Sequence, residues 1–174
     1  MAALTLHLVG IADDLVDAWN LAFGGHSDVR VLRANIVDVA VDTVVSPANS
    51  YGDMGGGVDL AYRNFFGRSI EHAVQSAIAE HHGPYLPIGE AVLVDTLHDR
   101  IPRLIAAPTM FLPEPTTDEN VRLAFTAVLR TAVKHRDVIS DVYCPGMGTG
   151  IGCVSPTNAA QAMLAAYESE IGHL

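Results

Sequence analysis

Residues 46–59 read SPANSYGDMGGGVD, a glycine-rich loop between a short apolar run and a helical pattern. Its glycines Gly55, Gly56 and Gly57 cost conformational entropy and offer no side chain to pack. Such a run is commonly a flexible turn, but here it leads into a helix start, where free N–H groups and the helix dipole favour an anion. Asp59 falls in the first turn of that helix, where a carboxylate either complements the dipole or takes part in catalysis. The segment therefore predicts an anion-binding loop beside a carboxylate whose role the spacing leaves open.

A second glycine-rich loop, PGMGTGIG, occupies residues 145–152. It is not a phosphate-binding P-loop, because Cys153 and Val154 stand where a P-loop has Lys followed by Ser or Thr. It also fails the dinucleotide fingerprint GxGxxG, since Ile151 or Cys153 occupies the place of the third glycine. Moreover, that fingerprint belongs near the first strand of a domain, whereas this loop follows the last expected strand.

Expected strands and helices alternate along the whole chain. We expect strands at residues 4–9, 29–33, 43–45, 91–95, 103–107 and 141–144, and helices at residues 13–23, 58–66, 69–81, 118–134 and 156–167. This order predicts an α/β fold with a mostly parallel sheet covered by helices on both faces. Ligands of such sheets bind at the carboxyl ends of strands, and each glycine-rich loop follows an expected strand.

Length and charge limit what the chain can bind. Its 174 residues fit a single domain over residues 1–174, and 20 acidic against 10 Lys and Arg residues give a net charge of −10. This charge opposes attraction to nucleic acid or an anionic membrane, so a phosphate ligand would need local backbone amides and helix N-termini. The N-terminus lacks the basic region of a signal peptide, and no apolar run could span a membrane, so we expect a cytoplasmic protein.

The metal-ligating residue types form no recognisable site. Two cysteines, Cys144 and Cys153, are too few for a disulfide framework or a four-ligand metal site. His72, His81 and His82 share one helical stretch without the spacing of a zinc site, so we expect neither a metal nor a cofactor. Cys144 fits a buried strand, whereas Cys153 is either a small loop residue or a thiolate activated by nearby amides.

The wider segment around the first loop, residues 32–67, reads LRANIVDVAVDTVVSPANSYGDMGGGVDLAYRNFFG. It resembles the signature of the macrodomain family, whose members bind ADP-ribose, and the spacing from Asn to the three glycines is intact. The resemblance continues through PIGEA at residues 87–91 and CPGMGTGIG at residues 144–152. It covers the chain from about residue 29 to the C-terminus and implies a three-layer α/β/α fold with a mixed, mostly parallel central sheet.

The resemblance also implies an ADP-ribose site. Asn35 matches a position that contacts the adenine amino group, and Ile36 matches its apolar neighbour in the adenine pocket. Asn49 matches an Asn that touches the distal ribose. The other expected ligand-binding positions lie in the two loops, and they are Ala48, Gly55, Gly56, Gly57, Val58, Gly148, Thr149, Gly150, Ile151 and Gly152.

Asp59 matches the carboxylate that hydrolytic members of the family place near the anomeric carbon of the distal ribose. A carboxylate there can orient or deprotonate a water that attacks this carbon, and it can stabilise positive charge developing on the sugar. We therefore expect Asp59 and Asn49 to be catalytic. The expected activity is removal of mono-ADP-ribose from a carboxylate ester on a protein, or deacetylation of O-acetyl-ADP-ribose.

Other functions remain open at this point. The same loops would serve a non-catalytic reader of ADP-ribose, which only turnover separates from an enzyme. A phosphatase acting on ADP-ribose-1″-phosphate would release phosphate with Asp59 intact, and a site for another nucleotide is a further alternative. Expected partners are ADP-ribose, an ADP-ribosylated substrate or an ADP-ribosylated protein, while the acidic charge argues against long RNA.

The chain departs from the family pattern at three positions. Asn35 stands where the family usually has Asp, so its contact with adenine would lack charge. Gly152 replaces an aromatic residue common in hydrolytic members, which predicts a more open ribose end. Arg63 replaces a common His in the helix after the first loop. We expect substitute contacts from Tyr51, Met54 or Phe111.

Overall fold

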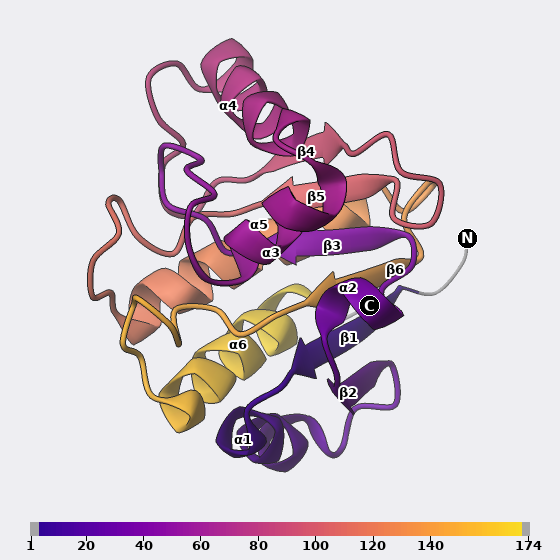
Figure 1. Cartoon of the computed structure of the whole chain (residues 1–174). Coiled ribbons are helices and arrows are strands. Elements are labelled where there is room, and N and C mark those ends of the chain that lie inside the picture. The colour runs from indigo at the N-terminus through magenta and orange to yellow at the C-terminus, as the bar shows by residue number, and fades with distance from the viewer. Residues whose placement is uncertain (1–3, 172–174) are drawn as a thin grey trace.

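One mixed sheet of six strands forms the centre of the computed structural model, which describes residues 4–171 (Figure 1). The strands are β1 (Thr5–Gly10), β2 (Val29–Arg33), β3 (Thr43–Ser46), β4 (Val92–Asp95), β5 (Arg103–Ala106) and β6 (Asp141–Cys144). Their order across the sheet is β2-β1-β6-β3-β5-β4. Only β4 runs antiparallel to its neighbour among these strands. The mixed, mostly parallel sheet is therefore confirmed.

Helices cover both faces of the sheet. They are α1 (Asp13–Phe23), α2 (Ile36–Val39), α3 (Gly57–Phe66), α4 (Ser69–His81), α5 (Asp118–Lys134) and α6 (Pro156–Glu170). Helices α1, α5 and α6 pack on one face over Trp19 and Phe125, whereas α2, α3 and α4 pack on the other over Tyr62 and Val74. This arrangement confirms the three-layer fold. Within residues 4–171 no helix is both long and apolar enough to cross a membrane.

The two cores follow from the alternation of side chains along each strand. Leu6 and Leu8 of β1 belong to the core beneath α1, α5 and α6, whereas Val9 belongs to the opposite core. Val45 and Val44 of β3 divide between the two cores in the same way. Because strands buried on both faces are apolar at consecutive positions, the short apolar runs in the sequence identified these strands correctly.

Helix α2 is the one element of the described chain that we did not predict. Its four residues are too few to show a helical period, and its only cap is Asn35, whose Oδ1 accepts the amide N–H of Val37 at 3.4 Å. The predicted strand ends and the other helix starts agree with the structure to within one residue. Helix α6 ends three residues beyond the predicted Tyr167, at Glu170.

Asp42 joins three strands at their amino ends, opposite the carboxyl edge where ligands of α/β sheets bind. One carboxylate oxygen accepts the amide N–H groups of Ser140 and Asp141 at 2.7 and 2.9 Å, and the other accepts from the Arg103 guanidinium at 3.1 Å. To reach them, Asp42 adopts a left-handed backbone with φ of 66°. A residue other than glycine holds this conformation only when contacts compensate for it, so these hydrogen bonds hold β3, β5 and β6 in register.

We predict that Asp42→Ala lowers the free energy of unfolding by roughly 3 kcal/mol, since these three hydrogen bonds to its carboxylate are lost while the left-handed backbone stays. Chemical denaturation would measure this difference. Asp42→Asn serves as the control, because it keeps one acceptor oxygen and should cost less. A loss below about 1 kcal/mol for Asp42→Ala would contradict this role.

Candidate functional site

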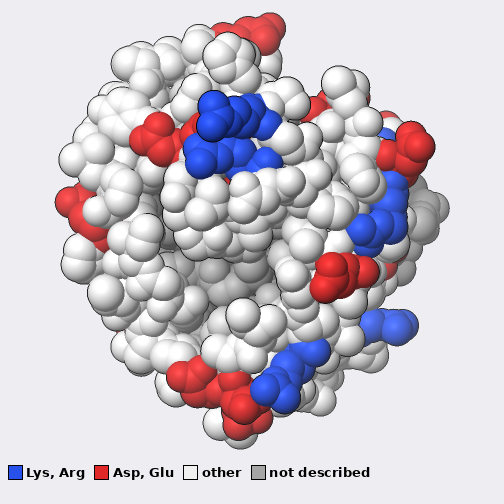
Figure 2. Space-filling view, viewed as in Figure 1, with Lys and Arg blue, Asp and Glu red and all other residues white. Residues whose placement is uncertain are grey.

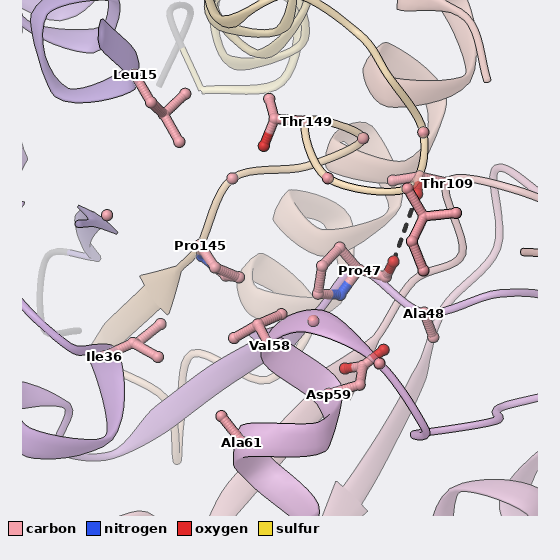
Figure 3. A pocket seen from close by; sticks show the side chains of 18 of the residues that line it. Leu15, Ile36, Pro47, Ala48, Val58, Asp59, Ala61, Thr109, Pro145 and Thr149 are labelled. Carbon is pink, nitrogen blue, oxygen red and sulfur yellow. Dashed lines mark hydrogen bonds between the residues drawn. The ribbon is translucent and has the colours of Figure 1, made fainter. Parts of the chain in front are cut away.

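The loops after β1, β2, β3, β5 and β6 enclose a cavity of about 800 Å³ at the carboxyl edge of the sheet. Every residue that the resemblance places at the ligand lines this cavity. Figure 3 shows that Leu15 and Ile36 lie toward one end of it and Ala48 and Asp59 toward the other. In Figure 2 the surface is hollowed near the middle of the view, with uncharged residues around the hollow.

The lining of the cavity contains no basic side chain from the described part of the chain. Its only charged side chains are Asp53 and Asp59, and neither Lys, Arg nor His reaches it. An anion in this cavity must therefore be held by backbone N–H groups, as the net charge of −10 had led us to expect.

The first loop supplies such groups at the start of α3. Gly56 is the N-cap of this helix, and Gly57 begins it with a left-handed φ of 56°, which glycine adopts without strain. The N–H groups of Gly57 and Val58 have no hydrogen-bond acceptor within residues 4–171. Since the first turn of a helix leaves its N–H groups unpaired, this end of α3 is suited to an anion.

The second loop supplies a further set of amides across the cavity. It turns at Gly148, whose φ is 73°, and the N–H groups of residues 149–151 have no acceptor in the described chain. A β-carbon built on Gly150 would meet no protein atom within 4 Å. Neither the backbone nor packing against the protein therefore demands glycine at position 150, which lines the cavity.

The two loops meet over the cavity at Ile151. This side chain is 51% exposed, and its Cδ1 lies 3.5 Å from where a β-carbon on Gly56 would stand. Both residues line the cavity, so the two loops approach each other here.

The structure explains why position 152 carries no side chain, while the more open ribose end expected from Gly152 stays a prediction. A β-carbon on Gly152 would lie 2.6 Å from the Gly148 carbonyl oxygen and 2.8 Å from Cγ2 of Thr116. Thr116 also donates its amide N–H to the Gly152 carbonyl at 2.8 Å. The space next to Gly152 is therefore filled by Thr116 and by the loop itself, and the fold requires glycine there.

Asp59 is a buried carboxylate in the cavity wall. It is 7% exposed, and the Ser46 hydroxyl donates a hydrogen bond of 2.5 Å to its Oδ1. Burial raises the pKa of Asp59 from 3.8 to about 7; the Ser46 hydrogen bond opposes this rise and the charge of Glu71 adds to it. Near neutral pH this group can thus both accept and release a proton, as general acid–base catalysis requires.

Asn49 is fixed by its own loop. Its Oδ1 accepts the N–H groups of Tyr51 and Asp53 at 3.0 and 3.3 Å, and its Nδ2 makes only a long contact of 3.5 Å with the Asp53 carbonyl. The side chain is 7% exposed and lines the cavity. Its amide nitrogen is therefore oriented and able to donate to a bound molecule.

The sequence did not identify several residues of the cavity. Gly10, Ile11, Ala12 and Leu15 form its wall where β1 leads into α1, and Thr109, Met110 and Pro113 contribute from the loop after β5. These loops carry no glycine run, and only their position after central parallel strands could have identified them. Ser46 was also missed, although a polar residue at the end of the buried run TVVS was an available signal.

The proposed substitutes for the missing family residues do not lie in the cavity. Met54 is fully buried in the core beneath α3 and α4, and its amide N–H donates to Glu71 at 2.9 Å. Arg63 pairs with the same Glu71 at 3.3 Å and does not line the cavity. Tyr51 and Phe111 lie outside the lining as well, on the surface nearby.

No group of three His, Cys, Asp or Glu side chains that could hold a metal occurs within residues 4–171. Cys144 is buried in β6, as predicted, and burial raises the pKa of its thiol, which leaves it protonated. Cys153 is exposed and lies outside the cavity lining.

Comparison with known proteins agrees with this geometry. A family model described as Macro domain matches residues 45–163. A protein of Aquifex aeolicus (strain VF5) is 40% identical over 139 residues, which are 79% of this chain and 79% of that protein. A macro domain-containing protein in the gbd 3'region of Cupriavidus necator is 31% identical over 82% of each chain.

Solved structures show the same fold. A mutant of the Oceanobacillus iheyensis macrodomain with ADPR superposes with a TM-score of 0.66, over 78% of this chain and 74% of that one. The two chains are 21% identical in sequence, so this likeness concerns the fold.

The burial of Asp59 predicts a specific dependence of stability on pH. The pKa of Asp59 in the folded state lies above its value in the unfolded state. Its contribution to the free energy of unfolding is therefore complete below pH 4 and is lost as the pH rises to about 7. The loss is on the order of 4 kcal/mol. We predict that Asp59→Asn, which keeps an oxygen acceptor for Ser46, equals the wild type in stability at pH 4 and exceeds it by this amount at pH 8. Urea denaturation at both pH values measures the difference, and a difference that does not change with pH would contradict the burial of this charge.

Proposed function

This chain belongs to the macro domain family, and on that premise we propose that its cavity binds ADP-ribose. The observation that carries this proposal is the pair of loops with unpaired N–H groups facing one cavity that has no basic side chain. A diphosphate is an anion that such amides can hold without a cation. The Oceanobacillus iheyensis macrodomain, whose fold this chain shares, has been solved as a mutant with ADPR.

The two ends of the cavity suit the two ends of the ligand. Val9, Leu15 and Ile36 make one end apolar, as a purine ring requires, and Asn35 stands beside them with its amide at the surface. We place the diphosphate between the two glycine loops and the distal ribose at the end formed by Asn49 and Asp59. The Asn35 side chain would then face the adenine edge as an uncharged hydrogen-bonding group.

We further propose that residues 1–174 form a single macro domain. The family model begins at residue 45, but β1 and β2 precede it and belong to the same sheet. Strand β1 pairs with β6, and the loop after β1 lines the cavity. The segment before the matched region is therefore needed for the fold and the site.

We propose hydrolysis of an ADP-ribosyl ester as the activity. Asp59 in its ionised form would accept a proton from a water as the water oxygen bonds to C1″ of the distal ribose. The bond from C1″ to the ester oxygen breaks, the carboxylate on the substrate leaves, and ADP-ribose carries the new hydroxyl. Asn49, held by its loop, would orient the ribose, and the same groups would serve deacetylation of O-acetyl-ADP-ribose by attack on the acyl carbon.

Two further candidates use the same cavity. A reader of ADP-ribose would bind without turnover, and a phosphatase would release phosphate from ADP-ribose-1″-phosphate. The raised pKa of Asp59 favours an enzyme, because a site that only binds a dianion gains nothing from a buried carboxyl group beside it.

We predict that Gly150→Val weakens ADP-ribose binding at least a hundredfold with no change in melting temperature, since Gly150 lines the cavity and a β-carbon there would meet no protein atom within 4 Å. Gly25→Val is the matched control, because a β-carbon on Gly25 also meets nothing within 4 Å and this glycine lies outside the cavity. Isothermal titration calorimetry and thermal unfolding give the two readouts. Equal affinities for the two variants would show that the second loop does not hold the ligand.

For hydrolysis, we predict that kcat rises with pH through about 7 and then levels, because only the ionised Asp59 accepts a proton from water. Asp59→Asn should reduce kcat at least a hundredfold while ADP-ribose affinity stays within about tenfold. Release of ADP-ribose from a protein mono-ADP-ribosylated on glutamate would be measured. Binding of ADP-ribose by the wild type without release of the product would identify the protein as a reader.

A further inference from the structure

Three aromatic side chains from three separate loops gather on the surface beside the cavity. Tyr51, Tyr85 and Phe111 are 39%, 40% and 40% exposed, although they contact one another. Phe111 lies edge-on to both tyrosines with ring centroids 5.3 Å apart, and the tyrosine centroids are 6.4 Å apart. We call these three residues the aromatic cluster.

Backbone hydrogen bonds hold the aromatic cluster in place. Leu86, next to Tyr85, donates its N–H to the Ser50 carbonyl at 2.8 Å, and Ser50 donates its N–H to the Met110 carbonyl at 3.0 Å. The loops after β3, α4 and β5 are thereby joined, and they lie side by side at the left of Figure 1. Large exposed aromatic rings on a fixed backbone are typical of a binding surface.

The aromatic cluster adjoins the end of the cavity that contains Asn49. Tyr51 lies between Asn49 and Asp53 in the sequence, and both of these residues line the cavity. Phe111 likewise follows Met110, a lining residue, and precedes Pro113, another. The same two loops therefore form the wall of the cavity and the surface next to it. A group attached to the distal ribose would leave the cavity toward this surface.

The three loops that carry the aromatic cluster are acidic in sequence. The three loops, residues 47–56, 82–91 and 107–117, contain no Lys or Arg. They contain three acidic residues, Asp53, Glu90 and Glu114, and all three are exposed. In Figure 2 the left edge of the view shows red patches, and a blue patch lies nearer the centre, above the hollow.

We propose that the aromatic cluster is the docking surface for a basic segment of the ADP-ribosylated protein. Lys and Arg side chains bind to aromatic faces by cation–π contacts and are attracted by neighbouring carboxylates. A nucleic acid would also stack on aromatic rings, but the acidic loops and the net charge of −10 oppose its phosphates. This inference rests on the proposed function, and it adds a preference for the sequence around the modified residue.

The test compares two peptides that each carry one mono-ADP-ribosylated glutamate, one with Lys and Arg around it and one with Ser at those positions. Affinities are measured by calorimetry in an Asp59→Asn background to prevent turnover, with free ADP-ribose as the reference. We expect the basic peptide to bind at least tenfold more tightly than free ADP-ribose, and the Ser peptide to bind about as tightly as free ADP-ribose.

The double variant Tyr85→Ser/Phe111→Ser should remove the tenfold gain and leave the affinity for free ADP-ribose unchanged. Tyr51 is kept in this variant because it lies between the cavity-lining residues Asn49 and Asp53. Leu21→Ser/Val138→Ser is the matched control, since it removes two exposed apolar side chains that lie outside the three loops. This control should keep the full gain.

Other outcomes overturn the proposal. Equal affinity for the two peptides would show that the aromatic cluster does not bind a basic segment. Tighter binding of an ADP-ribosylated oligonucleotide than of the basic peptide would show that the cluster binds nucleic acid instead. If the wild type sediments as a dimer and the double variant as a monomer, the aromatic cluster is an interface between two copies of this chain. Loss of free ADP-ribose binding in the double variant would assign the cluster to the cavity. If the wild type binds no ADP-ribose, the proposed function itself fails.

Discussion

The site depends on one constraint, which is that an acidic chain must hold an anion without any cationic side chain. Only backbone N–H groups remain for this task, and they must be unpaired and directed into one cavity. A parallel sheet meets the requirement, because its loops all emerge at the carboxyl edge and the helix that follows such a loop begins with free amides. The glycine at position 57 allows the turn into α3, and the glycine at position 150 leaves space for the ligand. The rest of the fold, down to the hydrogen bonds of Asp42 at the opposite edge, keeps these loops in register.

Burial of Asp59 opposes folding and suits the proposed catalysis. The carboxyl group lies in a wall from which water is largely excluded, and the Ser46 hydroxyl reduces the cost of its charge only in part. The protein therefore carries at this position a group that destabilises it at neutral pH. Such a feature is common where function, rather than stability, determines the residue. Ser46 holds the carboxylate in one orientation and is thereby a positioning residue for the proposed chemistry.

The sequence predicted the fold well, because each strand is a short apolar run and each long helix has clear boundaries. It also predicted both glycine-rich loops, because each loop is formed by one continuous stretch of residues. It did not predict contacts between residues distant in the chain. The Ser46–Asp59 hydrogen bond, the packing of Thr116 against Gly152 and the burial of Met54 all depend on how the loops are placed by the folded sheet. For the same reason the aromatic cluster, which draws on three separate loops, is visible only in three dimensions.

The central claim is that two loops of unpaired amides in an acidic protein form a site for ADP-ribose. The most direct measurement is a calorimetric titration of the wild-type protein with ADP-ribose, with AMP, ATP and NAD titrated in parallel. The account predicts micromolar binding of ADP-ribose and much weaker binding of the other three, because only ADP-ribose places a free ribose beside Asn49 and Asp59. No binding of ADP-ribose, or equal binding of AMP, would contradict it.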